Sequence, residues 1–147
     1  MARRPRNTNE PKPPRMLDVC VHGQPVSAQT AKRGALEAWK RHVRAACIAA
    51  WKQGQPPLDA AVGLQVTFYR ESELGDVDNL LKPIQDALQG IAYHNDRQIS
   101  DVSSRRRDID KAFKVRYMSP ALATAFSNGR QFVHIEVWCN PDQERVG

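Results

Sequence analysis

The chain has 147 residues, of which 41% are hydrophobic and 26% are charged. This composition is typical of one globular domain that can bury its own core, and the net charge of +6 favours a polyanionic partner. The three widely spaced cysteines, Cys20, Cys47 and Cys139, fit neither a disulfide framework nor a zinc site, so we expect reduced thiols. No stretch is apolar enough to span a membrane or to act as a signal peptide, so we expect a soluble cytoplasmic protein.

Acidic residues are concentrated in one part of the chain. Between Arg70 and Asp101 there are seven acidic and three basic residues, a local net charge of −4, so the remainder carries +10. A metal-dependent nuclease divides its charge in this way, because basic surfaces hold phosphates and carboxylates hold the metal.

The first fifteen residues differ in composition from the rest of the chain. Residues 1–15 contain four prolines and five basic residues against one acidic residue. Such a segment has too few apolar side chains to fold alone, so we expect a flexible basic arm followed by one folded domain over residues 16–147. The arm either adds phosphate contacts or only solubilises the protein.

A strand and a long helix are predicted after the arm. Apolar residues alternate over 16–22, which predicts the strand, and a break at 23–27 leads into the helix. The helix is predicted to start near Ser27 or Thr30 and to end at about Gln53. Its outer face is either simply solvated or a contact surface for a DNA backbone. The basic residues on that face are Lys32, Arg33, Lys40, Arg41, Arg44 and Lys52.

A second strand and helix follow. Clean alternation over residues 61–70 predicts a strand that leads into an acidic loop at 71–78. A helix is then predicted over about 80–89, with Asn79 as its cap. Pro83 is best tolerated in a first helical turn, so it sets the start of this helix no earlier than about Asn79.

The last third of the chain has weaker patterns. A strand is predicted over 99–107, and residues 113–117 alternate, so they extend it or form another strand. Residues 119–129 are predicted to be a loop or a short helix, and 131–139 a final strand. Together with the basic helix face, this part supplies the candidate DNA contacts, which are Lys32, Arg33, Lys40, Arg105, Arg106 and Arg107.

Side chains suited to metal chemistry gather in one stretch. Asp76 and Asp78 lie on the loop before the second helix with i, i+2 spacing, so in an extended segment both carboxylates point to the same side. Lys82 and Asp86 lie near one stripe of the helix, and Asp96 follows in a second acidic segment. Carboxylates from two segments with a lysine between them suit a hard cation beside an anionic substrate. From spacing alone, an acidic helix cap with an ordinary Lys82–Asp86 pair remains an equal alternative.

The same stretch carries three linked motifs. They are D-V-D-N-L-L-K at residues 76–82, D-A-L at 86–88 and N-D-R-Q-I-S-D at 95–101. In this order they resemble the RusA family of crossover-junction endodeoxyribonucleases, which are often found in phages and prophages. The resemblance covers roughly residues 17–107 and the last strand.

The resemblance implies a fold and a reaction. The fold is a small single α/β (α+β) domain with a mixed sheet of about four strands packed by two main helices, and it forms a tight homodimer. The reaction is the Mg²⁺-dependent cleavage of paired phosphodiesters in four-way (Holliday) DNA junctions during recombination and repair, with Mn²⁺ as a possible substitute. The partners it implies are junction DNA and a second copy of the chain, with no membrane.

The resemblance also implies roles for individual residues. Asp76, Asp78 and Asp96 match the metal-binding aspartates, and Lys82 matches the catalytic lysine. Three further residues are expected to support them from neighbouring positions, namely Asn79, Asn95 and Asp101.

Two departures from the family pattern leave alternatives open. Asn95 stands where the family has the first acid of an Asp-Asp pair, which either weakens metal affinity or shows that Asp96 is the ligand. The stretch 108–129 exceeds the compact family plan. A DNA-binding protein that holds junctions without cutting them, and a metal-dependent nuclease for other branched DNA, are therefore the competing hypotheses.

Overall fold

Four strands and three α-helices form over the residues that the structure describes, which are 13–71, 77–111 and 113–141 without the side chains of Val77 and Asp78. The structure is a computed structural model. No helix within these ranges is both long and apolar enough to cross a membrane. The elements in chain order are β1 (Leu17–His22), α1 (Arg33–Ala50), β2 (Val62–Arg70), α2 (Val77–Leu88), a 3-10 turn (Asp96–Gln98), β3 (Ile99–Asp108), α3 (Pro120–Ser127) and β4 (Phe132–Cys139).

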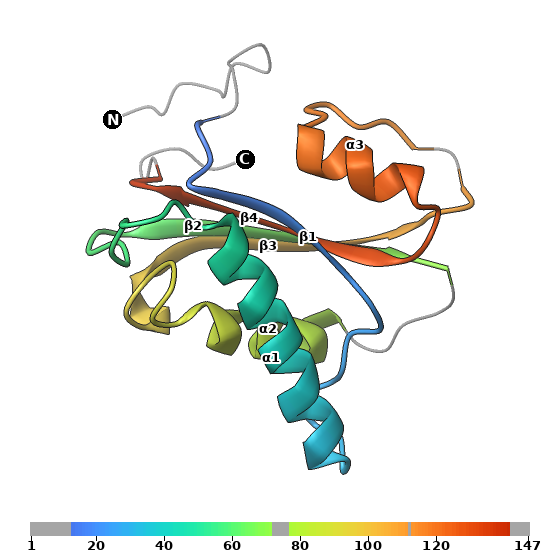
Figure 1. Cartoon of the computed structure of the whole chain (residues 1–147), viewed down its shortest axis with the longest axis horizontal. Coiled ribbons are helices and arrows are strands. Elements are labelled where there is room, and N and C mark those ends of the chain that lie inside the picture. The colour runs from blue at the N-terminus through green and yellow to red at the C-terminus, as the bar shows by residue number, and fades with distance from the viewer. Residues whose placement is uncertain (1–12, 72–76, 112, 142–147) are drawn as a thin grey trace, which may run out of the picture.

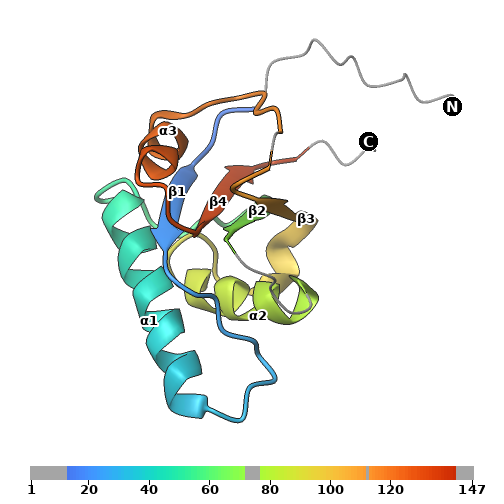
Figure 2. The same ribbon diagram turned by 90° about the vertical axis from the view of Figure 1, so that its right-hand side faces the viewer.

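The strands form one mixed sheet in the order β1-β4-β2-β3. β4 runs antiparallel to both of its neighbours, whereas β3 runs parallel to β2 at one edge of the sheet. A parallel pair needs a crossover connection, and α2 supplies it. α1 and α2 cover one face of the sheet and α3 lies on the other (Figures 1 and 2). The expected mixed sheet of four strands with two main helices is confirmed, and α3 is a third helix.

The main core lies between the sheet and the pair α1 and α2. Strand alternation turns one row of apolar side chains from β1, β4 and β2 toward the helices. This packing fixes the position of α2 and therefore of the charged residues on its outer side. Its members include Val19, Leu64, Phe68 and Ile135 from the sheet, Trp39 and Val43 from α1, and Leu80, Ile84 and Leu88 from α2.

A second, smaller core lies on the opposite face beneath α3. The rings of Tyr69 and Phe132 stack with their centroids 4.7 Å apart, and Phe126 of α3 meets Tyr69 edge-on at 4.9 Å. Leu122 and Ala125 of α3 are buried beside these rings. α3 therefore covers the aromatic end of this face.

The three cysteines are free thiols, as predicted. Cys47 is fully buried in the main core, and burial raises the pKa of its thiol to about 12. Burial, together with nearby carboxylates, also raises the pKa of Cys20 to about 12. These two thiols are therefore protonated and unreactive at neutral pH.

α1 starts later than predicted, at Arg33 instead of near Ser27 or Thr30. The hydroxyls of Ser27 and Thr30 accept hydrogen bonds from backbone N–H groups two residues ahead, at 3.1 and 3.2 Å. They therefore stabilise two turns and do not cap the helix. α1 also ends earlier, at Ala50, because Trp51 is extended and its indole donates to the next loop at 2.8 Å.

α2 starts earlier than predicted, at Val77, so Asp78 lies in its first turn and not on the preceding loop. Pro83 is consequently inside the helix, where it has no N–H to donate to the carbonyl of Asn79. The N–H of Ala28 donates to that carbonyl instead, at 2.8 Å. The loop between β1 and α1 thus supplies the hydrogen bond that the proline cannot make, and Asn79 lies within the helix and does not cap it.

The segment between β3 and β4 forms no further strand in its described residues. The strand predicted from alternation at 113–117 is wrong, because Phe113 packs its ring against Tyr69, with centroids 5.7 Å apart. Of the two predictions for 119–129, a loop or a short helix, the structure has the helix, which is α3. Ser119 caps it by accepting a hydrogen bond from the Leu122 N–H at 3.2 Å.

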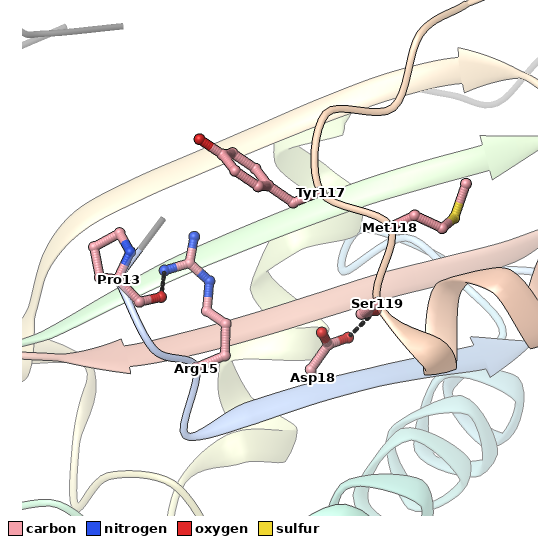
Figure 3. A pocket seen from close by; sticks show the side chains of 6 residues that line it. All are labelled: Pro13, Arg15, Asp18, Tyr117, Met118 and Ser119. Atoms are coloured by element: carbon pink, nitrogen blue, oxygen red, sulfur yellow. Dashed lines mark hydrogen bonds between the residues drawn. The ribbon is translucent and has the colours of Figure 1, made fainter. Parts of the chain in front are cut away.

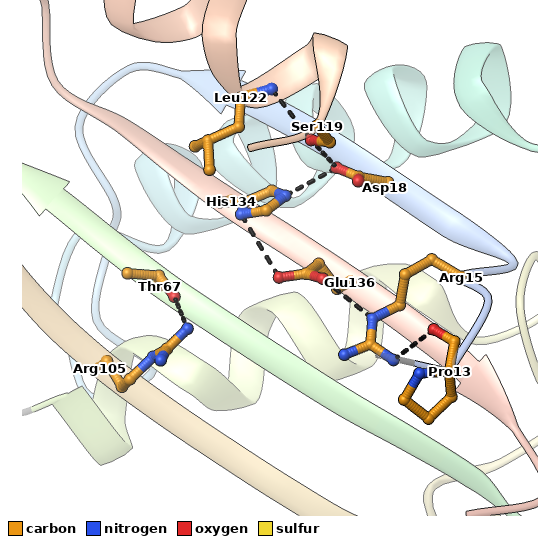
Figure 4. A network of polar contacts seen from close by, with 9 residues as sticks. All are labelled: Pro13, Arg15, Asp18, Thr67, Arg105, Ser119, Leu122, His134 and Glu136. Atoms are coloured by element: carbon orange, nitrogen blue, oxygen red, sulfur yellow. Dashed lines mark hydrogen bonds and ion pairs between the residues drawn. The ribbon is translucent and has the colours of Figure 1, made fainter. Parts of the chain in front are cut away.

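A network of polar and charged side chains crosses the α3 face of the sheet (Figure 4). Arg15 donates from Nε to Glu136 at 2.9 Å. The His134 ring lies 3.5 Å from Glu136 and 2.7 Å from Asp18, and Ser119 donates to Asp18 at 3.2 Å. The side chains of His134 and Glu136 are only 4% and 2% exposed. This network links the segment before β1, two strands and the start of α3.

Arg15 packs on the folded domain, although the composition of residues 1–15 led us to assign it to the flexible arm. Besides the contact with Glu136, its guanidinium lies over the ring of Trp138, 4.1 Å from the centroid. Residues 1–12 lie outside the described residues. The prediction of a flexible basic arm therefore still applies only to residues 1–12.

We predict that Arg15→Ala lowers the free energy of unfolding by about 3 kcal/mol, because it removes one partner from a buried ion pair. Chemical denaturation measures this value. The control is Arg41→Ala on the exposed side of α1, which should change stability by less than about 0.5 kcal/mol. Equally small decreases in the two variants would show that the network does not stabilise the fold.

Candidate active site

Two segments form the candidate site, namely α2 and the turn that leads into β3. Asp76 lies outside the described residues, and Asp78 is described only by its backbone, in the first turn of α2. The structure therefore leaves the predicted grouping of Asp76 and Asp78 with Asp96 untested. It does place the side chains of Lys82 and Asp96, and it brings them together.

Lys82 contacts two carboxylates. Its Nζ lies 2.8 Å from Asp86 Oδ1 and 2.7 Å from Asp96 Oδ2. The first contact is an i, i+4 pair within α2, whereas the second joins α2 to the turn before β3. The hydrogen bond with Asp86, and then the one with Asp96, raises the pKa of Lys82 above its usual value. The ammonium is therefore charged at neutral pH, and it is about half exposed.

Asp96 is held at both carboxylate oxygens. Gln89 Nε2 donates to Oδ1 at 2.9 Å, and Lys82 donates to Oδ2 at 2.7 Å. Partial burial alone would raise the pKa of Asp96. The hydrogen bonds from Lys82 and Gln89, with the Lys82 charge, outweigh it and lower this pKa. Asp96 is therefore an oriented, ionised carboxylate at neutral pH.

Asn95 has a structural task beside Asp96. It is the N-cap of the 3-10 turn, and its side chain accepts a hydrogen bond from the Arg97 N–H at 2.8 Å. Gln98 completes the capping box by accepting from the Asn95 N–H at 3.2 Å. An asparagine can serve as this cap as well as an aspartate, because capping needs a side-chain oxygen but no charge.

Gln98 also fastens the turn to the segment before β2. Its amide donates to the carbonyls of Leu58 and Ala60 at 2.6 and 2.9 Å. The turn that carries Asp96 is therefore tied to a segment that is distant in sequence, which limits the positions that Asp96 can adopt.

Asp101 is not placed beside Asp96, although the two are close in sequence. The β2–β3 register shifts between Val62 and Gly63, so that Asp101 pairs with Gly63. Gly63 lies on the α3 face, where the indole of Trp138 occupies the space that a side chain would need. Alternation therefore places Asp101 on the α3 face, and this does not support the expected position next to the metal ligands.

The candidate DNA contacts on α1 lie at different distances from this site. Lys40 reaches it, with Nζ 4.0 Å from Asp86 Oδ2. Lys32 and Arg33 lie at the N-terminal end of the helix, which extends well beyond the sheet (Figure 2). Lys40 can therefore place a positive charge next to the acidic cluster.

The arginine run on β3 is divided between the two faces of the sheet. Arg106 pairs with Phe68, whose side chain is in the main core, so alternation places Arg106 on the side of α1 and α2. Arg105 lies on the α3 side and donates to Thr67 at 3.2 Å (Figure 4), and Arg107 shares that face by alternation. The run cannot act as one continuous patch.

Arg44 has a role that its exposed position on α1 did not suggest. Its Nη1 donates to the carbonyls of Ala87 and Gln89 at 3.1 and 2.7 Å. The last carbonyls of a helix lack partners within the helix, so Arg44 caps the end of α2 from a neighbouring element. Periodicity could not reveal this contact, because it depends on how two helices pack.

The structure also gathers three possible metal ligands that the sequence analysis missed. Asp18, His134 and Glu136 each offer one atom that could bind a metal ion, and these three atoms all lie within 4.8 Å of one another. Each carboxylate already has a hydrogen-bond donor or cation beside it, since Arg15 contacts Glu136 and His134 contacts Asp18. We therefore interpret the cluster as the structural network described above. Alternation along β4 sets residues 134 and 136 on one face, but only the pairing of β1 with β4 brings Asp18 beside them.

A hollow of about 420 Å³ lies beside this network (Figure 3). It is on the α3 side of the sheet, whereas Lys82 and Asp96 are on the side of α2, so it does not extend the candidate site. Its lining residues are Pro13, Arg15, Asp18, Tyr117, Met118 and Ser119.

The surroundings of Asp96 fit a hard divalent cation such as Mg²⁺. Such ions prefer oxygen ligands, and Asp96 offers an ionised carboxylate that already holds the cationic Lys82 at 2.7 Å. Asp78 lies one turn before Lys82 on the same helix, so its backbone position is compatible with a carboxylate nearby.

Comparison with known proteins agrees with the motifs and the fold. The family model described as endodeoxyribonuclease RusA matches residues 20–122, which is well over half of the chain. The match includes β1 from Cys20 onward, both helices of the main core, β2, β3 and the candidate site. A search among curated proteins found no match. The mixed sheet, the site on its crossover helix and the family match lead to one conclusion: this chain belongs to the RusA family of endodeoxyribonucleases.

Proposed function

We propose that this protein is a Mg²⁺-dependent endonuclease that resolves four-way DNA junctions by paired, symmetric cleavage. The observation that carries the proposal is the contact between Lys82 and Asp96, which unites two of the three family motifs in one charged site. Such a site suits attack on a phosphodiester, because negative charge grows on the phosphate and must be balanced.

The proposed metal ligands are Asp96, Asp78 and Asp76. When bound, Mg²⁺ lowers the pKa of a coordinated water and offsets charge on the phosphate. The chain itself contributes the orientation of Asp96, which Gln89 and the capped turn hold in place. These contacts limit the reorganisation needed when the site is used.

Lys82 is proposed to bind the scissile phosphate. An ammonium has three N–H donors, of which two point to Asp86 and Asp96. The third remains for a phosphate oxygen, and about half of the side chain is accessible to solvent. Lys40 contacts the other carboxylate oxygen of Asp86, so it can add a second positive charge next to the bound DNA backbone.

Paired cleavage requires two sites. A four-way junction has two-fold symmetry, so a symmetric homodimer would present one site to each of two opposite strands. We therefore propose that the protein acts as a homodimer. We also propose that it is located in the cytoplasm, where it contacts DNA.

The test is a cleavage assay on a synthetic four-way junction, with linear duplex and flap DNA as controls, in Mg²⁺ and in EDTA. Paired nicks on the junction alone that disappear in EDTA are the expected result. Junction binding without cutting would identify a non-cleaving DNA-binding protein. Preferred cutting of the flap would identify a nuclease for other branched DNA.

We predict that Asp96→Asn lowers the cleavage rate on the order of 100-fold or more, the scale expected when one electrostatic group is removed from an active site. Junction binding should persist or strengthen, because a negative charge is removed next to DNA. The control is Asp110→Asn, an exposed carboxylate in the connection after β3. Wild-type cleavage by Asp96→Asn would remove Asp96 from the mechanism.

We predict that the basic residues of segment 1–12 bind DNA phosphates. Replacing Arg3, Arg4, Arg6 and Lys12 with glutamine keeps the length of the segment and should weaken junction binding. The slope of log K against log salt should fall by about 1 for each phosphate that the variant no longer neutralises. An unchanged slope would show that this segment does not touch DNA. The variant retains Arg15, so the buried network stays intact.

A further inference from the structure

Gln89 follows the last residue of α2 and directs its side chain at Asp96. Its Nε2 donates to Oδ1 of Asp96 at 2.9 Å, while Lys82 donates to Oδ2 at 2.7 Å. The two oxygens of one carboxylate thus have different partners, a neutral amide and a cation.

Hydrogen bonds hold the backbone of Gln89 and of the turn that follows it. Arg44 of α1 donates to its carbonyl at 2.7 Å. The next residue, Gly90, has a φ of +82°, which reverses the chain immediately after Gln89. The Gly90 N–H donates to the Tyr93 carbonyl at 2.7 Å. The hydroxyl of the buried Tyr93 donates to the backbone carbonyl of Gln85, also at 2.7 Å. The amide of Gln89 is therefore presented from a rigid turn.

The two partners of Asp96 differ in what they can do beside a metal ion. Lys82 is a long, half-exposed side chain, and its ammonium competes with any other cation for Asp96. The Gln89 amide is neutral and uses one oxygen only, so its hydrogen bond is compatible with a cation at the other oxygen. Hydrogen bonds of this kind orient ligand carboxylates and commonly contribute about 10–100-fold to metal affinity.

We propose that Gln89 is a positioning residue that holds the Asp96 carboxylate in its metal-binding orientation. Gln89 acts through Asp96 and is not itself a ligand. The inference rests on the proposed metal-binding role of Asp96. It assigns a function to a residue that lies outside the three sequence motifs, in the connection between the second and the third.

The experiment measures metal binding by the full-length protein without DNA. Mg²⁺ and Mn²⁺ are titrated calorimetrically into the wild type, Gln89→Met and Gln85→Met. Methionine keeps the length of the side chain but removes the donor. Gln85 lies one turn earlier on α2 and contributes its backbone carbonyl, not its side chain, to the contacts above, so it is a matched control.

The expected result is an affinity about 10–100-fold lower in Gln89→Met, with wild-type affinity in Gln85→Met and similar melting temperatures in all three proteins. Gln89→Asn, which retains an amide but is too short to keep the same contact, should bind metal as weakly as Gln89→Met. It also replaces Gln89→Met if that variant does not fold.

Three results would overturn the inference, and they have different meanings. Wild-type affinity in both Gln89 variants would show that Asp96 does not need Gln89. A decrease in affinity that only parallels a lower melting temperature would show that Gln89 stabilises the turn and does not position a ligand. No metal binding by the wild type would reject the proposed metal site itself, and the role of Gln89 with it.

Discussion

One backbone hydrogen bond, from the Ala28 N–H to the Asn79 carbonyl, fastens the loop after β1 to the helix that carries the candidate site. Pro83 has no N–H to satisfy that carbonyl, and a buried carbonyl without a partner would cost roughly 1–3 kcal/mol. The loop after β1 supplies the missing donor and is thereby attached to the first turns of α2. The same turns carry Asp78 and Lys82, so an apparent defect in the helix helps to orient it against α1.

Around this helix, hydrogen bonds and ion pairs join charged residues to neighbouring segments. Lys82 joins α2 to the turn that carries Asp96, and Gln98 joins that turn to the segment before β2. Arg44 joins α1 to the end of α2. A site built from several segments in this way is held in shape before any ligand arrives, which lowers the cost of reorganisation during a reaction.

The sheet separates two surfaces with different tasks. The side of α1 and α2 carries the candidate site together with Lys40 and, by alternation, Arg106. The α3 side carries a buried network in which Arg15, His134 and two carboxylates satisfy one another, so its polar groups contribute to stability. The described part of the stretch 108–129, which includes α3, lies on this second face. It therefore adds to the family fold without altering the face that holds the candidate site.

The sequence by itself determined the class of fold, the approximate positions of all four strands and the family. These properties follow from local periodicity and from motifs in which neighbouring residues act together, such as the alternation of β2 or the run from Asp96 to Asp101. It also predicted that Lys82 and Asp96 belong to one site, and the structure brings their side chains into contact.

Tertiary structure alone decided how the helices end and which residues meet. α2 tolerates Pro83 because Ala28 donates from another segment, and Arg44 of α1 caps the end of α2. A bulge moves Asp101 to the other face, and packing brings Gln89 to Asp96. None of these outcomes leaves a local signature, because each depends on a partner that the chain brings close only after it has folded.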